Sequence, residues 1–97
     1  MTRVVLSARI LDDLARIEQH LRTHEVADVE VRVAEILGAL AILGKHPLIG
    51  RKSDHGHREL VIGRGSRGYV ALYVYDAQGD AVTVAALRAQ REAGYGP

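Results

Sequence analysis

The sequence predicts an α+β fold of the order β-α-α-β-β-β, in which a helical hairpin packs on a small, mainly antiparallel sheet. Apolar residues recur at helical spacing in two long segments of the N-terminal half. The C-terminal half instead holds three runs rich in β-branched residues and tyrosine. Only short links separate neighbouring elements, so the two helices and the three strands are each expected to be antiparallel.

The chain is expected to begin with a strand and an amphipathic helix. Residues 3–6 form a short β-branched run, and Ser7 follows as a helix N-cap whose hydroxyl accepts a free amide of the first turn. Apolar positions then recur at steps of four, three and four residues. They are Ile10, Leu14, Ile17 and Leu21. We therefore expect a helix over about residues 8–23.

A second apolar stripe predicts the other helix of the hairpin. Its positions are Val29, Val33, Ile36, Leu40 and Leu43. Gly44 is expected to take the left-handed conformation that ends a helix, and Pro47 lies just beyond it. Only residues 24–27 separate the two helices, and so short a link implies that they are antiparallel.

The remaining segments predict a loop and a three-stranded meander. Residues 47–57 are polar and broken by glycine, which is typical of an exposed loop. Strands are expected at 58–62, 69–75 and 81–87, and Gly79 is expected to supply a positive φ in the last turn.

Both faces of the last two strands are apolar. Strict alternation in the last strand places Val82, Val84 and Ala86 opposite Thr83, Ala85 and Leu87. One face should take the helices, which leaves the other as a concave surface for a partner.

Length and composition predict one domain over residues 1–97 with an aliphatic core. The 97 residues are 47% hydrophobic but include no Phe and no Trp. Without cysteine, neither a disulfide nor a thiolate metal site is available. There is no secretion leader, and no apolar run approaches the roughly 18 residues of a membrane span. We therefore expect a cytoplasmic protein with no membrane contact.

Charge is distributed unevenly along the chain. Residues 1–44 hold five Arg against seven Asp or Glu, a net charge of −2, whereas residues 45–97 hold eight Lys or Arg against five acids, a net charge of +3. This asymmetry favours a basic functional half. The isoelectric point of 8.2 is nevertheless below the value of about 9 that is typical of dedicated nucleic-acid binders.

The histidines and the glycine-rich loop are interpreted as ordinary surface features. His55 and His57, with His46 upstream, lack the frame that fixes zinc geometry, so neither a metal nor a cofactor is expected. His20 and His24 are spaced for one helix face but lie beside its polar side. Residues 64–68 lack the Lys-Ser/Thr ending of a phosphate-binding loop and precede a strand, which indicates a hairpin loop.

The candidate contact residues are arginines and tyrosines. Arg88 and Arg91 are expected to grip an acidic segment or a target, unless they only pair locally with Glu92, because guanidinium groups suit carboxylate and phosphate alike. Tyr69 and Tyr73 share one strand face with Tyr75, where packing, partner contact or stacking on bases are all open. Tyr95, behind a glycine near the terminus, is freer to act.

The order of these elements and several short motifs resemble the RelE/ParE superfamily of bacterial toxins. The motifs are Pro47-Leu48-Ile49-Gly50-Arg51, Arg58-Glu59-Leu60-Val61-Ile62, Tyr73 in mid-strand and the closing Leu87-Arg88-Ala89-Gln90-Arg91-Glu92-Ala93-Gly94-Tyr95. The resemblance covers nearly the whole chain. It implies the toxin half of a type II toxin-antitoxin module, with a plasmid-stabilization role, in a hetero-oligomer with an antitoxin that contributes an acidic and apolar segment. Operator DNA would be reached only through that antitoxin.

The resemblance also implies one of two activities. RelE-like members cut mRNA on the ribosome, and ParE-like members inhibit DNA gyrase. In the family pattern a catalytic Arg stands three residues before the mid-strand Tyr, and counting back from Tyr73 gives Val70. Many relatives also place a His after the last strand, where this chain has Arg88 and Ala89. Both positions favour a ParE-like gyrase inhibitor that is not itself an enzyme.

Two alternatives stay open. The ending at residues 87–92 departs from the Leu-His ending of several ParE-like toxins, so a ribosome-dependent mRNA endonuclease is the second hypothesis and a non-toxic antitoxin-binding module the third. As an inhibitor the chain has no catalytic residues, and its target or antitoxin contacts are expected at Arg58, Arg67, Tyr69, Tyr73, Arg88, Arg91 and Tyr95. As a nuclease it would use Arg51, Arg58, Arg67, Arg88, Arg91 and Tyr95.

Overall fold

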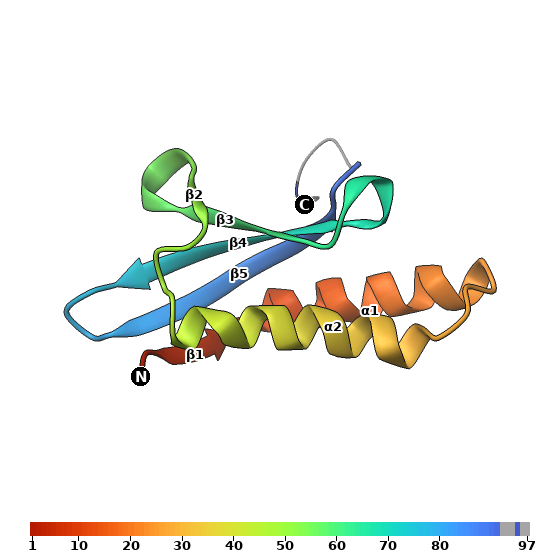
Figure 1. Cartoon of the computed structure of the whole chain (residues 1–97), viewed down its shortest axis with the longest axis horizontal. Coiled ribbons are helices and arrows are strands. Elements are labelled where there is room, and N and C mark those ends of the chain that lie inside the picture. Colours follow the sequence, from red (N-terminus) through yellow and green to blue (C-terminus); the bar gives the residue numbers. More distant parts are fainter. Residues whose placement is uncertain (92–94, 96–97) are drawn as a thin grey trace.

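The computed structural model describes residues 1–91 and 95, and it has two layers. The elements in order are β1 (Arg3–Leu6), α1 (Ala8–Thr23), α2 (Val29–Ala41), β2 (Arg51–Lys52), β3 (Arg58–Ile62), β4 (Tyr69–Asp76) and β5 (Ala81–Ala89). Short 3₁₀ turns lie at Ile42–Gly44, Asp54–Gly56 and Gly65–Arg67. The two helices pack side by side on one face of the sheet (Figure 1). The predicted α+β class, the hairpin and the meander are confirmed.

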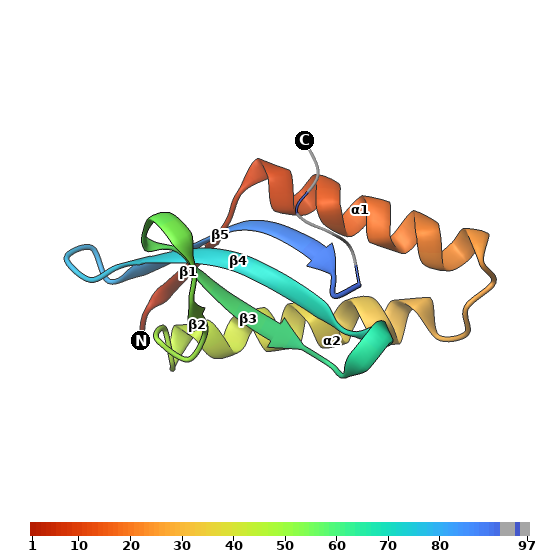
Figure 2. The same ribbon diagram turned by 90° about the horizontal axis from the view of Figure 1, so that it is seen from above.

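The sheet has five strands in the order β1-β5-β4-β3-β2. β1 pairs in parallel with β5, and the other neighbours are antiparallel. The sheet is therefore mainly antiparallel, as predicted. The longest strands, β4 and β5, lie in its centre, as the view from above shows (Figure 2).

The core is aliphatic and lies between the helices and the inner face of the sheet. Ser7 caps α1 as predicted, since its hydroxyl oxygen accepts from the Ile10 amide at 3.2 Å. The buried residues of the helices include Ile10, Ile17, Leu21, Ile36 and Leu40. They pack on Ile62, Ala71, Tyr73, Val82, Val84 and Leu87 from the sheet. Tyr73 is thus a large aromatic group at the centre of this core.

Two glycines do not have the conformation expected of them. Gly44 does not have a positive φ; it ends a 3₁₀ turn and is buried against the start of the chain. The Thr2 amide donates to its carbonyl at 2.9 Å, and a Cβ at Gly44 would lie 3.2 Å from the Thr2 oxygen. Close approach, rather than a left-handed turn, explains this glycine. In the β4–β5 turn the positive φ, 48°, belongs to Asp80 and not to Gly79.

The segment expected to be an exposed loop contains an additional edge strand. Residues 51–52 pair with β3, so the expectation is wrong at this point, because a two-residue strand is too short to show any alternation. Gly50 just before it is buried, and its amide donates to the Tyr73 hydroxyl at 2.8 Å. The loop is therefore anchored in the core at one residue.

A β-bulge in β5 overturns the alternation predicted for this strand. Leu72 pairs with Ala86 but Tyr73 pairs with Val84, so Ala85 is an extra residue without a partner in β4. Beyond the bulge the faces exchange, and Leu87 enters the core while Arg88 turns to the outer face. Two helix side chains bind the irregular backbone, since the Ser7 hydroxyl donates to the Ala85 carbonyl at 3.1 Å and Asp13 accepts from the Leu87 amide at 2.9 Å.

Candidate functional site

Four side chains from four segments form a continuous polar cluster on the outer face of the sheet. Arg51 Nε lies 3.2 Å from a Glu59 carboxylate oxygen, and the Tyr95 hydroxyl donates to the other oxygen at 2.6 Å. The Arg88 guanidinium lies over the Tyr95 ring, with 5.0 Å between its central carbon and the ring centroid. We call Arg51, Glu59, Arg88 and Tyr95 the outer-face cluster.

Strand register brings three members of the outer-face cluster together. Arg51 stands opposite Glu59 in the β2–β3 pair, so their side chains share one face. Arg88 stands opposite Val70 in the β4–β5 pair, and the bulge before it places its side chain on that same face. Its Nη1 also donates to the carbonyls of Ala89 and Gln90, at 3.2 and 3.1 Å, so the side chain is held near the strand end.

The protonation states of the outer-face cluster are fixed around neutrality. The hydrogen bond from Tyr95, aided by the nearby Arg51 charge, lowers the pKa of Glu59 against the opposing effect of burial. Burial, with the hydrogen bond to Glu59, raises the pKa of Tyr95 to about 12. At neutral pH the carboxylate is therefore charged and the phenol is a donor. Such a pair provides no group that exchanges a proton near neutrality.

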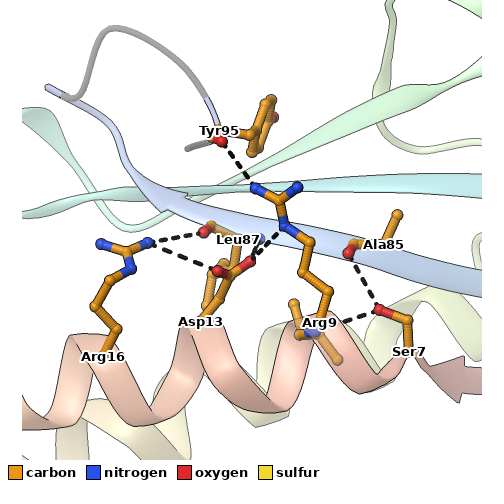
Figure 3. A network of polar contacts seen from close by, with 8 residues as sticks. Ser7, Arg9, Asp13, Arg16, Ala85, Leu87 and Tyr95 are labelled. Carbon is orange, nitrogen blue, oxygen red and sulfur yellow. Dashed lines mark hydrogen bonds and ion pairs between the residues drawn. The ribbon is translucent and has the colours of Figure 1, made fainter. Parts of the chain in front are cut away.

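A second network fixes the backbone of Tyr95 to α1. Arg9 Nη2 donates to the Tyr95 carbonyl at 2.8 Å, and its Nε lies 3.6 Å from Asp13 (Figure 3). Asp13 is itself 8% exposed and accepts from the Leu87 amide. Arg16 Nη2 reaches the Leu87 carbonyl at 3.4 Å from the next turn of the helix. Tyr95 is thus held at both its side chain and its backbone.

The outer face around this cluster is only partly open. Val61 is 41% exposed, and Leu72 and Val74 are half-buried. Val70, however, is fully buried, and Ala86 nearly so. The expected concave apolar surface therefore covers less of the sheet than alternation suggested, although its apolar character is confirmed.

Two of the predicted contact residues have structural roles within the fold. Arg58 lies on the inner face opposite Tyr73 and donates through Nη1 to the carbonyls of Gly50 and Leu48, at 2.9 and 3.3 Å. Tyr73 has no exposed surface. Its ring fills the core and its hydroxyl receives the Gly50 amide. A partner cannot reach this ring in the folded chain, so Tyr73 is not part of an exposed contact surface.

The other predicted residues gather at a different place. Arg67, Tyr69 and Arg91 line a pocket of about 540 Å³ between the end of α1 and the ends of β4 and β5. Sequence reasoning did not include Arg16 and Arg32, which also line it, because they come from separate helices whose packing is not visible in local spacing. Glu92, the expected local partner of Arg88 and Arg91, lies outside the described residues.

The histidine loop has the surface position that the sequence predicted. His55 is exposed, and His57 Nδ1 lies 3.1 Å from the Asp54 carbonyl oxygen. Within residues 1–91 and 95, no group of three or more His, Asp or Glu side chains is arranged to hold a metal ion. None of the helices in this part of the chain has the length and apolar character needed to cross a membrane.

Comparison with known proteins identifies the family. The family model described as ParE toxin of type II toxin-antitoxin system, parDE, matches residues 4–94. The chain is also similar to Toxin RelE3 of Caulobacter vibrioides, with 32% identity over 89 residues that cover 91% of this chain and 94% of the relative. The family-model match spans the helical hairpin and all of the sheet except the first residue of β1. The chain therefore belongs to the ParE toxin family of type II toxin-antitoxin systems, within the RelE/ParE superfamily.

Proposed function

We propose that this chain stops growth by protein-protein contact with DNA gyrase in the cytoplasm and is neutralised by a cognate antitoxin. The observation that carries the proposal is Val70, which is aliphatic and fully buried where the RelE-like pattern has its catalytic Arg. A buried valine cannot stabilise developing phosphate charge. Arg88 stands opposite Val70, and the other polar groups of the outer-face cluster near the strand end, Glu59 and Tyr95, are bound to each other, with the pKa of Glu59 lowered and that of Tyr95 raised.

The outer-face cluster is the proposed gyrase contact. It presents Arg51 and Arg88 beside partly exposed apolar residues, a combination typical of protein interfaces. Its preformed hydrogen bonds reduce the ordering that binding would require. A contact surface of this kind needs no catalytic group.

Gyrase supercoiling in the presence of the purified chain tests this function. We expect inhibition and accumulation of cleaved DNA, and we expect Arg88→Ala to weaken both. Arg3→Ala is the matched control, because Arg3 is exposed on β1 outside the outer-face cluster. Unchanged supercoiling with the wild-type chain would sink the gyrase proposal.

Ribosome-dependent mRNA cleavage is the second candidate, and one observation favours it. Arg88 lies over the Tyr95 ring, and Arg51 contacts Glu59 on the same face, which places positive charge suited to a phosphate beside a hydroxyl group. Primer extension on ribosome-bound message decides between the two functions. Cuts in the A-site codon that depend on Tyr95 would replace the gyrase proposal with this one. Normal growth on expression without antitoxin would instead favour a non-toxic binding module.

The antitoxin is proposed to bind as an extended acidic and apolar segment. An open groove of about 980 Å³ runs between α2 and the β3–β4 loop, with Val31, Ile36 and Ile62 on its apolar side. Arg64 and Arg67 supply positive charge from the loop. Such a groove suits a segment that folds on binding. Co-purification with the product of an adjacent small open reading frame tests it, and the absence of any complex would contradict it.

A further inference from the structure

The pocket between α1 and the ends of β4 and β5 concentrates basic side chains from several elements. We call it the basic pocket. Arg16, His20 and His24 come from the α1 side, Arg32 from α2, Arg67 from the loop before β4, and Arg91 from the turn after β5. In Figure 2, seen from above, the end of β5 lies over the space between the two helices, and Figure 1 shows it in the sheet layer. The basic pocket encloses about 540 Å³, within the range of sites for small ligands.

The described residues that line the basic pocket include four arginines and no carboxylate. Asp28 and Glu35 line the neighbouring groove, which shares Arg32 with the pocket. Arg16 lies 3.9 Å from Asp13, outside the lining. Within the described part of the chain, Arg32, Arg67 and Arg91 form no ion pair, in contrast with Arg22 and its 2.9 Å contact to Glu30. Like charges gathered around one cavity attract an anion.

Backbone pairing holds two of these arginines at one rim. The Gln90 amide donates to the Gly68 carbonyl at 2.9 Å, which joins the residues next to Arg67 and Arg91. Gly68 is buried, and a Cβ there would lie 2.5 Å from the Gln90 side-chain oxygen. The backbone hydrogen bond joins the segments before β4 and after β5. The main chain that carries Arg67 and Arg91 is therefore held together before any ligand arrives.

The rest of the lining favours an anion that also carries an apolar or flat body. Ile17 and Leu21 are buried, and the half-buried Tyr69 contributes a ring wall. His20 and His24, with 4.1 Å between their ring centroids, add nitrogen atoms at the edge. Guanidinium groups bind phosphate oxygens through paired hydrogen bonds, and an aromatic ring can stack on a base.

From these features we propose that the basic pocket binds a phosphate ester of nucleotide size. This goes beyond the gyrase and antitoxin contacts proposed above, because the pocket shares no described lining residue with the outer-face cluster and requires neither partner. Arg32, Arg67 and Tyr69 line both the basic pocket and the groove beside α2. An acidic peptide is the competing anion. It lacks the tetrahedral phosphate that several converging guanidinium groups can share.

Calorimetric titration of the isolated chain with AMP, ADP and inorganic pyrophosphate tests the proposal. We expect saturable binding at one site, tighter for ADP than for pyrophosphate because of the apolar wall. Arg67→Ala and Arg91→Ala should each weaken ADP binding roughly tenfold or more, since each removes a charge-assisted contact. Arg67→Lys should lose less than Arg67→Ala, because it keeps the charge but not the paired donors.

Arg64→Ala is the matched control, since Arg64 belongs to the same loop but lines only the groove beside α2. It should leave ADP affinity within about twofold of the wild type. Thermal melting checks that each variant is folded, which we expect because all three arginines are exposed. A short single-stranded oligonucleotide distinguishes a nucleic-acid phosphate from a free nucleotide.

Three outcomes would overturn the proposal: no saturable binding of any phosphate compound, equal losses in Arg64→Ala, or affinity for a glutamate-rich peptide that exceeds affinity for ADP. The assay contains neither gyrase nor antitoxin. Failure of the proposed toxin function would therefore leave this result unchanged.

Discussion

The Tyr95 hydroxyl donates to the Glu59 carboxylate at 2.6 Å and so joins two positions that are 36 residues apart in the sequence. Burial is the largest cause of the raised Tyr95 pKa of about 12, and this hydrogen bond is the next largest. We expect Glu59→Gln to lower the Tyr95 pKa toward its ordinary value of about 10. Absorbance of the phenolate during an alkaline titration measures it, and Tyr95→Phe identifies which transition belongs to this ring.

Tyr75 is an internal control for that titration, because its pKa is raised by burial and by Asp80, not by Glu59. Its transition should not move in Glu59→Gln. Equal shifts of both tyrosines would show a general loosening of the fold rather than the loss of one hydrogen bond.

The same pair makes stability depend on pH at two extremes. The pKa of Glu59 is lowered in the folded state, so its contribution is present above the unfolded pKa, about 4.3, and is lost as pH falls through the folded value. The pKa of Tyr95 is raised, so its contribution is present below pH 10 or so and is lost as pH rises toward about 12. Denaturant unfolding of wild type and Tyr95→Phe should therefore differ most between these limits, and a pH-independent difference would contradict it.

Asp13→Ala should destabilise the chain by about 1–3 kcal/mol, because it leaves the buried Leu87 amide without its acceptor. Asp13→Asn keeps an acceptor oxygen and should lose less. Urea unfolding measures both changes. Asp12→Ala is the control, since Asp12 is the exposed neighbour on the same helix and should change stability by no more than about 0.5 kcal/mol.

Two glycine substitutions should have opposite signs. A Cβ at Gly50 would lie 2.6 Å from the Tyr73 ring and 2.8 Å from the Glu59 carbonyl, so Gly50→Ala should cost about 1–3 kcal/mol. Gly38 in α2 has nothing within 4 Å, and Gly38→Ala should stabilise the helix by about 0.5–1 kcal/mol. Thermal melting of the two variants compares them directly. A stabilising Gly50→Ala would show that the Gly50–Tyr73 contact is loose in solution.

Arg58→Ala should reduce stability by roughly 1 kcal/mol, because its guanidinium binds the Gly50 and Leu48 carbonyls. Arg64→Ala should have little effect, since Arg64 is exposed in the loop after β3. Denaturant unfolding compares the two variants. If Arg58→Ala and Arg64→Ala were equally stable, the hydrogen bonds of Arg58 would contribute nothing to the fold, and Arg58 would be available for contact with a partner.

Local patterns predicted the elements well. The helical stripe that begins at Ile10 and the β-branched run at residues 58–62 each report a periodicity within one segment, and both elements have the expected bounds. The order of those elements and several short motifs carried the resemblance to the family, which the comparisons with known proteins confirmed. The features that local alternation could not reveal are formed by residues that are far apart in the sequence.

The bulge at Ala85 is the main example. Ala85 and Ala86 are both small, so neither marks which side chain is the extra one, and the partners that stabilise the bulge, Ser7 and Asp13, lie more than 70 residues away. The basic pocket is hidden for the same reason, since its arginines come from different elements. The sequence shows which residue types are present, but only the packed structure shows that they lie together at these two sites.

The extra residue at Ala85 determines which face of the sheet each later side chain of β5 occupies. Regular alternation from Val84 with Ala85 retained would direct Arg88 toward the helices and Leu87 toward solvent, so the bulge is what keeps Arg88 in the outer-face cluster. Deleting Ala85 would remove the bulge and leave Leu87 and Arg88 opposite Ala71 and Val70, on their present faces. Within this family, a one-residue gap at this position would therefore mark a last strand that is regular but presents the same residues on its outer face.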